Sequence, residues 1–454
     1  MTILEEYARK HPRSRELYEE AKGLFPSGVT HDTRYVHPFP LFMTNGKGAR
    51  KWDVDGNEYA CCVMGHGALI LGHGHPEIVR AVQEQMERGT HLGSSTESEL
   101  RWARAVKRLI PAIEKIRFHS SGTEATLMAI RLARAFTGKP RILMFNDHFH
   151  GWSDCVIPET GKWSSGGITP ATFQTSLRVP AGDIGAVEKA LKENSDIAAV
   201  MLEPTGASMG CYPLRPAFVR ELRELTAGLG ILLIFDEVVT GFRVSPGGAQ
   251  EKLGVRPDLT ALAKICAGGL PGGAVGGRSE IMDMIAFRDD PGWDAGRRVS
   301  HPGTYNANPL SAAAGARCLE LIAERPVNRT ADDAALRLAS GLNRALGKMG
   351  VPGIAYRSAS IVWALFGLSP GEVKRCSDVE GEDEGFLPLP HGRIKEAVSS
   401  QTAQIFKRAL LNTGVDIMGS SEFILSAAHG DKVIDEIVEA FERAVARMKE
   451  ERVI

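Results

Sequence analysis

The sequence predicts an α/β protein with a large domain built on a mostly parallel sheet and a smaller α+β domain. Three observations lead to this prediction: the chain has 454 residues, short apolar runs alternate with helical patterns between residues 75 and 325, and the pattern breaks near Pro326. A chain of this length exceeds one small module. Apolar runs separated by helices are typical of a buried parallel sheet with helices on both faces. We therefore expect an N-terminal segment (1–74) that contributes to the small domain, a large domain (75–325) and a C-terminal small domain (326–454).

The strands expected in the large domain are short and largely apolar. They are 116–118, 141–145, 197–202, 231–235, 259–263 and 274–275. The helical patterns between them cover 76–88, 97–110, 123–137 and 215–228. Residues that follow these strands are expected at one edge of the sheet, where open α/β sheets bind ligands.

The flanking segments predict the smaller domain. A hairpin is expected over 51–59, where Asp-Gly separates alternating residues. The other expected elements are a helix over 330–348, a strand over 360–366 and a closing amphipathic helix over 431–449. Two stretches read as loops, namely 156–172, rich in Gly, Ser, Thr and Pro, and 378–392, acidic and then Pro-rich.

The composition argues against several classes of protein. Lys plus Arg (54) nearly balances Asp plus Glu (55), which argues against a nucleic-acid partner because phosphate-backbone binding needs a basic surplus. The first twenty residues are charged and no apolar run approaches the roughly 18 residues of a membrane span, so neither a signal peptide nor a membrane association is expected. The seven cysteines form no CxxC pair, which favours a reducing, cytoplasmic setting over a disulfide framework.

The first motif with possible chemistry is Ser120-Ser121-Gly122-Thr123-Glu124-Ala125, between a strand and a long helix. Backbone N–H groups at a helix start, assisted by the helix dipole, form a site for a phosphate group. The alternative is a plain capping box formed by Ser121 and Glu124. Taken alone, the motif favours the cap.

Two further residues end apolar strands. Asp236 follows Ile234-Phe235, and its carboxylate could pair with a protonated ring nitrogen, cap a helix or bind magnesium. Lys264 follows 259–263 and precedes a glycine-rich loop. Partial desolvation would favour its neutral, nucleophilic amine, whereas most lysines simply reach solvent. A phosphate cradle, a strand-end Asp and a strand-end Lys, in this order, are together what pyridoxal 5′-phosphate (PLP) requires.

The order of these motifs resembles the class III aminotransferases, which are fold type I PLP enzymes. Within that family the chain is most similar to the branch with glutamate-1-semialdehyde aminomutases, β-amino-acid aminotransferases and D-phenylglycine aminotransferases. The resemblance covers almost the whole chain and is carried by Ser121 to Ala125, Phe149-His150-Gly151, Glu203-Pro204, Asp236-Glu237-Val238, Thr240 to Arg243, Lys264 and Gly303-Thr304.

The resemblance implies a role for each residue of a cofactor site. Lys264 holds PLP as a Schiff base and moves the proton, while Asp236 pairs with the pyridinium nitrogen. The other implied cofactor-binding residues are Ser121, Gly122 and Thr123 at the phosphate, Thr304 reaching the phosphate of the other subunit, Phe149 and Val238 on the two ring faces, and His150 and Glu203 close to the ring. Phe149 stands where relatives often have Tyr, so the hydrogen bond of that phenol is absent. Thr304 implies a homodimer with shared active sites.

Arg34 and His66 are the expected substrate-binding residues. Arg34 ends a segment (28–34) that in this branch places an arginine at the substrate carboxylate, which a guanidinium can bind bidentately; a surface arginine is an equally good interpretation. His66 lies where the aminomutases carry Trp. The histidines in this part of the chain, His66, His73, His75 and His91, lack acidic or cysteine partners at ligand spacing, so no metal site is expected.

These features favour an aminotransferase that moves an amino group between an amine, or an aromatic or β-amino acid, and a 2-oxo acid acceptor. Two observations favour the aminotransferase over an aminomutase: the presence of His66, and Glu422, which is out of register with the aminomutase glutamate. The first alternative is glutamate-1-semialdehyde 2,1-aminomutase, an isomerase that needs no acceptor. The second is an inactive PLP-fold binding protein, against which the presence of Lys264 and Asp236 argues.

Overall fold

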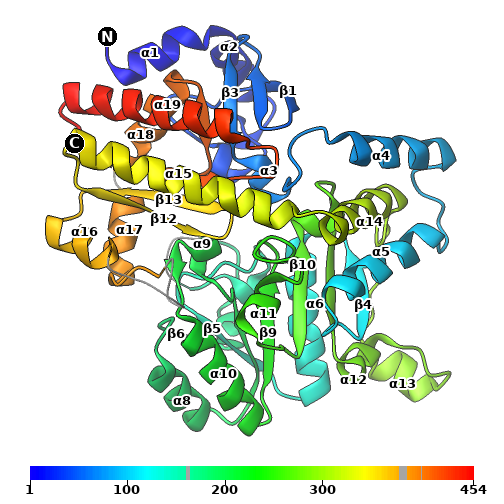
Figure 1. The fold of residues 1–454 in the computed structure, drawn as a ribbon. Helices are drawn as coiled ribbons and strands as arrows, with labels where there is room; N and C mark the ends of the chain where they lie inside the picture. The colour runs from blue at the N-terminus through cyan, green and yellow to red at the C-terminus, as the bar shows by residue number, and fades with distance from the viewer. Residues whose placement is uncertain (160–163, 378–385, 400) are drawn as a thin grey trace. The chain divides into compact units, whose positions relative to one another are not determined.

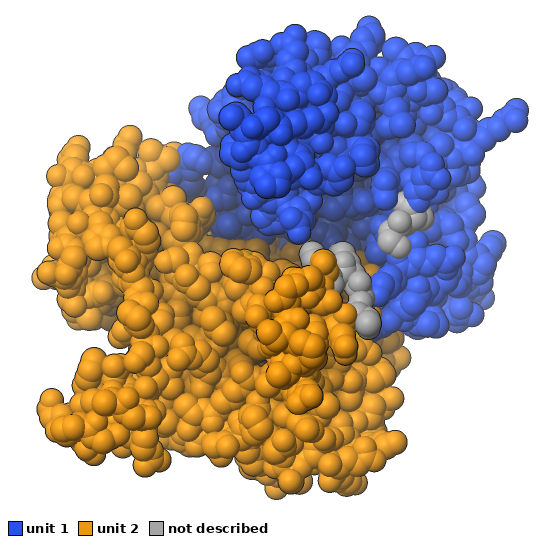
Figure 2. Space-filling model, turned by 180° about the vertical axis from the view of Figure 1, so that it is seen from behind, with its two compact units in different colours: residues 1–75, 329–380, 387–454 blue, residues 76–328, 381–386 orange. Residues whose placement is uncertain are grey.

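The computed structural model describes residues 1–159, 164–377, 386–399 and 401–454, and the chain divides into two compact units (Figure 2). Unit 1 comprises residues 1–75, 329–380 and 387–454, and unit 2 comprises residues 76–328 and 381–386. Each unit has sheets and a core of its own, so each is described separately.

Unit 2 is built on a seven-stranded sheet (Figure 1). Across the sheet the strands are β4 (Lys115–His119), β11 (Gly273–Gly277), β10 (Leu259–Ala263), β9 (Leu232–Glu237), β7 (Ile197–Leu202), β5 (Arg141–Phe145) and β6 (Ser176–Val179). All of them run parallel except β11, which pairs antiparallel with both β10 and β4. The mostly parallel α/β fold that the sequence predicts is confirmed. The run at 274–275 is its antiparallel strand, because residues 264–272 are too few for the crossover that a parallel connection needs.

Both faces of this sheet are covered by helices, as its strand sequences require. Along β5, Ile142 and Met144 belong to one apolar cluster with α6 (Gly122–Thr137), whereas Leu143 and Phe145 belong to another with α8 (Ile184–Glu193) and α10 (Pro216–Gly228). Successive strand residues point to opposite faces. Continuous apolar runs therefore need an apolar partner on each side.

The remaining helices of unit 2 agree with the helical patterns of the sequence only at the first two, which were expected over 76–88 and 97–110. They are α4 (Pro76–Arg88), α5 (Glu97–Leu109), α7 (Pro170–Phe173), α9 (Ala207–Gly210), α11 (Gly248–Leu253), α12 (Ser279–Met282), α13 (Pro291–Gly296) and α14 (Pro309–Glu324). The stretch 156–172, expected to be a loop, contains the start of α7 because Pro170 is favourable at the first position of a helix.

Unit 1 combines the two ends of the chain. Its first sheet has the order β1 (Met43–Lys47), β2 (Arg50–Asp53), β3 (Glu58–Cys62) and β14 (Val415–Ile417), and its second the order β12 (Gly353–Ser358), β13 (Ile361–Phe366) and β15 (Glu422–Ile424). Strands β2 and β3 form the hairpin expected around Asp55-Gly56. Strand β14 pairs parallel with β3, so the N-terminal hairpin is completed by a strand more than 350 residues away in sequence.

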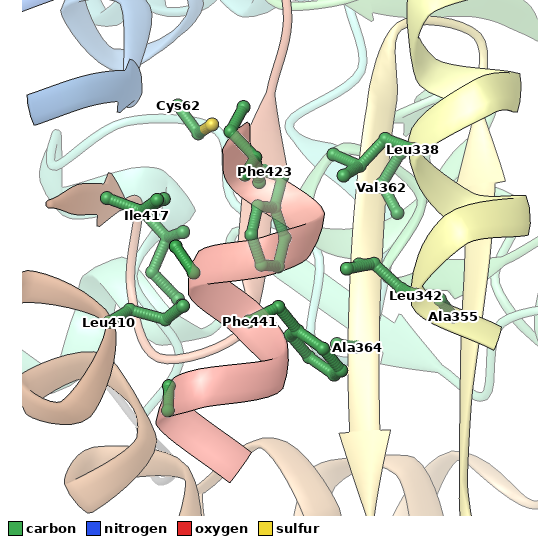
Figure 3. Packing of buried hydrophobic residues seen from close by; sticks show 14 of the residues in the cluster. Cys62, Leu338, Leu342, Ala355, Val362, Ala364, Leu410, Ile417, Phe423 and Phe441 are labelled. Atoms are coloured by element: carbon green, nitrogen blue, oxygen red, sulfur yellow. The ribbon is translucent and has the colours of Figure 1, made fainter. Parts of the chain in front are cut away.

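The core of unit 1 lies between its helices and these sheets (Figure 3). Phe441 of α19 (Asp431–Glu450) packs with Leu342 of α15 (Val327–Met349) and Ala364 of β13. The other helices of this part of the chain are α1 (Ile3–Lys10), α2 (Pro12–Ala21), α3 (Met64–Gly67), α16 (Pro370–Ser377), α17 (His391–Ser399) and α18 (Gln401–Asn412). The loop expected over 378–392 lies mostly outside the described residues, and its end is the first turn of α17. Among the described residues, no helix is long and apolar enough to cross a membrane.

Candidate functional site

The candidate residues of unit 2 leave its sheet at one edge. Register pairs Ala261 of β10 with Asp236 of β9, and it pairs Gly273 of β11 with both Ala263 and His119. The segments that follow β4, β10, β9, β7 and β5 therefore start beside one another, because the carboxyl ends of parallel strands share an edge. These segments carry the polar residues singled out from the sequence.

The turn after β4 is both a helix cap and a cradle of free N–H groups. Ser121 is the N-cap of α6, and its Oγ accepts a hydrogen bond from the Glu124 N–H at 3.2 Å. The Glu124 carboxylate accepts from the N–H of Ser120 at 2.6 Å, one residue before the position a capping box requires. The N–H groups of Gly122 and Thr123 precede the first intrahelical hydrogen bond, so they remain available to an anion. The two interpretations of this motif are thus compatible.

Glycine is required in the cradle by close packing. A Cβ on Gly122 would lie 2.9 Å from Cγ1 of Val238. Val238 is therefore beside the cradle, as expected for a residue that contacts the same bound group. Gly151, at φ 96°, would similarly place a Cβ 2.6 Å from Thr123 Oγ1.

Asp236 is a buried carboxylate that is held from two sides. One oxygen accepts the Val238 N–H at 3.0 Å, and the other accepts a hydrogen bond from His150 Nδ1 at 2.7 Å. Because a carboxylate only accepts, Nδ1 of His150 carries the proton in this contact. Each Asp236 oxygen keeps a lone pair for one more donor, such as a protonated ring nitrogen.

The segment 148–151 is fastened to three neighbouring elements. His148 Nδ1 accepts the N–H of Glu203 at 2.9 Å, and the His150 carbonyl accepts from Thr126 Oγ1 at 2.7 Å. Phe149 lies between them, and its N–H donates to Glu203 Oε1 at 2.9 Å. Phe149 itself is 41% exposed, in contrast to the buried anchors on either side of it.

Lys264 leaves β10 in a left-handed backbone conformation, with φ 53°. Such strain in a non-glycine residue persists only where the surroundings fix it, and it is common at functional sites. Burial lowers the pKa of the Lys264 amine, and the charges of Asp236 and Glu203 act in the opposite direction. A lysine of this kind reaches the neutral, nucleophilic state more readily than an exposed one.

Glu203 is almost fully buried at the end of β7. Burial, and next the charge of Asp236, raise the pKa of its carboxyl to about 7. The resemblance implies that Glu203 lies close to the cofactor ring, without a defined role there. Among the described residues, its carboxylate accepts backbone N–H groups from Phe149, Ser208 and Met209.

The two expected substrate residues, Arg34 and His66, belong to unit 1 and are described within that unit. Arg34 is exposed, and its Nη1 donates to Thr30 Oγ1 at 2.8 Å. His66 has φ 56° in the left-handed run of α3, and its ring lies 5.3 Å from that of His31. Thr304 belongs to unit 2, where its exposed backbone carbonyl accepts a hydrogen bond from His91 Nε2 at 2.6 Å.

Two features of the site were missed from the sequence. His148 contacts the backbone of Glu203, and Ser208 and Met209 aim their N–H groups at its carboxylate. Nothing local distinguishes Ser208-Met209, since neither residue type favours the left-handed backbone that both adopt. The described residues include no group of three or more His, Cys, Asp or Glu side chains placed to hold a metal ion.

The sequence profile of the family described as "Aminotransferase class-III" matches residues 32–420. A curated relative, the glutamate-1-semialdehyde 2,1-aminomutase of Syntrophobacter fumaroxidans, is 40% identical over 96% of this chain and 98% of its own length. Among solved structures, an omega-transaminase from Sphaerobacter thermophilus superposes with a TM-score of 0.84 at 32% identity, covering 96% of this chain and 98% of that one. A transaminase solved with PLP bound has the same TM-score at 28% identity, covering 97% and 98%.

The residues present fit PLP as the resident cofactor. The N–H groups at the start of α6 can bind its phosphate, and the remaining lone pairs of Asp236 can accept a hydrogen bond from its ring nitrogen. The desolvated amine of Lys264 can react with its aldehyde. Nε2 of His150 is also buried with no hydrogen-bond partner among the described residues.

Proposed function

The chain belongs to the class-III aminotransferases, PLP-dependent enzymes, and from this premise we propose that it is a glutamate-1-semialdehyde 2,1-aminomutase, which forms 5-aminolevulinate. The observation that carries the proposal is the 40% identity to an enzyme of that name over nearly the full length of both chains. The sequence had favoured the aminotransferase and ranked the aminomutase second. The identity to relatives named as aminomutases supports the aminomutase more strongly.

In the proposed mechanism, bound PLP supplies an electron sink for the carbon that carries the amino group. Lys264 would hold the cofactor, and its neutral Nζ would take and return the proton of that carbon. Asp236 keeps a proton on the ring nitrogen, and His150 holds Asp236 in place through the 2.7 Å hydrogen bond. The N–H groups of Ser121, Gly122 and Thr123 bind the phosphate.

The second candidate is an aminotransferase that needs a 2-oxo acid acceptor. It is supported by the 32% identity to the omega-transaminase, by His66 in place of the aminomutase Trp and by the position of Glu422. In both candidates the residues of unit 2 do the same work. Arg34 and His66 are proposed to select the substrate.

We also propose a homodimer, in which Thr304 of each subunit contacts the phosphate bound by the other. In support, residues 86–95, which comprise the last turn of the amphipathic helix α4 and the segment after it, are almost entirely exposed and include Met86 and Leu92. His91 and Asn308 tie this segment to the loop that carries Thr304. The seven cysteines are buried and form no disulfide among the described residues, which supports the proposed cytoplasmic location.

The test is incubation of the PLP-loaded enzyme with glutamate-1-semialdehyde and no other amino compound or acceptor. An aminomutase forms 5-aminolevulinate continuously, because the product carries the nitrogen that the substrate brought. An aminotransferase stops once its cofactor is aminated and resumes when a 2-oxo acid is added.

A further inference from the structure

The buried Glu203 lies beside a turn, at Ser208 and Met209, whose backbone conformation is unfavourable for these residue types. Ser208 and Met209 both have left-handed φ values, 52° and 66°, although neither is glycine. The turn is nevertheless largely buried, with Ala207 and Cys211 almost inaccessible to solvent. An L-residue in this conformation needs an interaction that compensates for the strain.

The Glu203 carboxylate provides that interaction. The N–H of Met209 donates to Oε2 at 3.0 Å, and the N–H of Ser208 donates to Oε1 at 3.3 Å. Successive N–H groups in such a turn converge into a small anion site, which here is filled by a side chain of the same protein. The base of the turn is fixed as well, because a Cβ on Gly206 would lie 2.1 Å from the Tyr212 carbonyl oxygen.

The same carboxylate also holds the segment expected to contact the cofactor. Oε1 of Glu203 accepts the Phe149 N–H at 2.9 Å, and the Glu203 N–H donates to His148 Nδ1 at 2.9 Å. One buried carboxylate thus joins the turn after β7 to the segment after β5.

We propose that Glu203 is a positioning residue, which clamps the Phe149 backbone to the turn of Ser208 and Met209 and so sets where the Phe149 ring lies on the bound cofactor. This inference rests on the proposed cofactor role of Phe149. Glutamine is the informative replacement. Its amide keeps one acceptor oxygen, but its NH2 group would face one of the backbone N–H donors that the carboxylate now accepts.

The test compares Glu203→Gln with wild type and with Glu237→Gln in the full-length, PLP-loaded enzyme. Glu237 is a matched control, since it is a buried carboxylate at the neighbouring strand end and accepts the N–H groups of Ala249 and Gln250. We expect Glu203→Gln to retain PLP but to show at least twofold weaker visible circular dichroism per bound cofactor. Its kcat should fall about tenfold, with KM changed less than twofold. In the cofactor-free protein, peptides covering 147–151 and 205–211 should exchange amide hydrogens faster. Glu237→Gln should show none of these changes.

Unchanged circular dichroism and kcat per bound cofactor in Glu203→Gln would overturn the proposal, even if the variant were less stable. If Glu203→Gln does not fold, Thr126→Val carries the test, because it removes the hydroxyl that holds the same segment at the His150 carbonyl. It should weaken the circular dichroism in the same direction, and no change would overturn the proposal. A wild-type enzyme that is inactive on glutamate-1-semialdehyde would contradict the proposed function. It would not affect this inference, because the circular dichroism and hydrogen-exchange measurements need no substrate.

Discussion

The candidate residues of the two units occupy opposite kinds of structure. In unit 2, Lys264, Asp236 and Glu203 lie at the ends of regular strands, and the two carboxylates are held by buried hydrogen bonds. In unit 1, Arg34 and His66 lie in short helical turns; Arg34 is exposed, and His66 has a left-handed backbone. The difference suggests a division of labour. Residues fixed by the sheet serve chemistry that every substrate needs, and residues on turns can change without disturbing the fold.

The largest effect is expected at Lys264. Lys264→Ala removes the amine that binds PLP and moves the proton, so turnover should fall by at least about 10³-fold for every substrate. The circular dichroism of the backbone should stay unchanged. Lys252→Ala, an exposed lysine of the same unit, is the control and should have wild-type activity. Substantial turnover by Lys264→Ala without added amine would place the chemistry elsewhere.

Asp236→Asn should come next, with a loss of about 10²–10³-fold in kcat. A neutral amide cannot keep the ring nitrogen protonated, although it can still accept the hydrogen bond from His150. Steady-state kinetics on the PLP-loaded variant measure the loss, with exposed Asp154→Asn as the control. A kcat within threefold of wild type would mean that another group maintains the protonated ring.

The buried charge of Glu203 should also be visible in stability. Its folded pKa of about 7 lies above the unfolded value of 4.5, so the folded protein binds this proton more tightly. The resulting stabilisation is complete below pH 4.5 and is lost as the pH rises through about 7, by on the order of 3 kcal/mol. Asp236, His150 and Lys264 are the titratable groups that interact with it.

Urea unfolding of cofactor-free wild type and Glu203→Gln at pH 5 and pH 7.5 measures this contribution. Wild type should lose more stability than the variant between the two pH values. Equal losses would show that the Glu203 carboxyl is not protonated preferentially in the folded state.

The smallest effect is expected in unit 1. Arg34→Ala should raise KM for substrates with a carboxylate about tenfold, equivalent to about 1.4 kcal/mol, and should change kcat and the KM of simple amines little. Arg329→Ala, whose guanidinium is 85% exposed in the same unit, is the control. If Arg34→Ala lowered kcat as much as Asp236→Asn, this would contradict the proposal that the unit 1 residues select the substrate and the unit 2 residues carry out the chemistry.

The parts of the site that could be predicted are those with a local cause. Strand-end positions of Asp236 and Lys264 follow from apolar runs of five or six residues, and the Ser121 cap follows from a glutamate three residues later. The direction of β11 depends on the length of a connection, which the composition of the strand does not reveal. The turn of Ser208 and Met209 is held by a carboxylate that precedes it, and no propensity of either residue indicates that conformation.

The measurement that distinguishes the two candidate functions most directly is the amount of 5-aminolevulinate formed per active site from glutamate-1-semialdehyde alone. The measurement uses enzyme loaded with PLP and freed of other amino compounds, with Lys264→Ala as the blank. The proposed aminomutase predicts steady formation of many equivalents per site, unaffected by a 2-oxo acid. Formation of no product, or of no more than one equivalent until a 2-oxo acid is supplied, would contradict it.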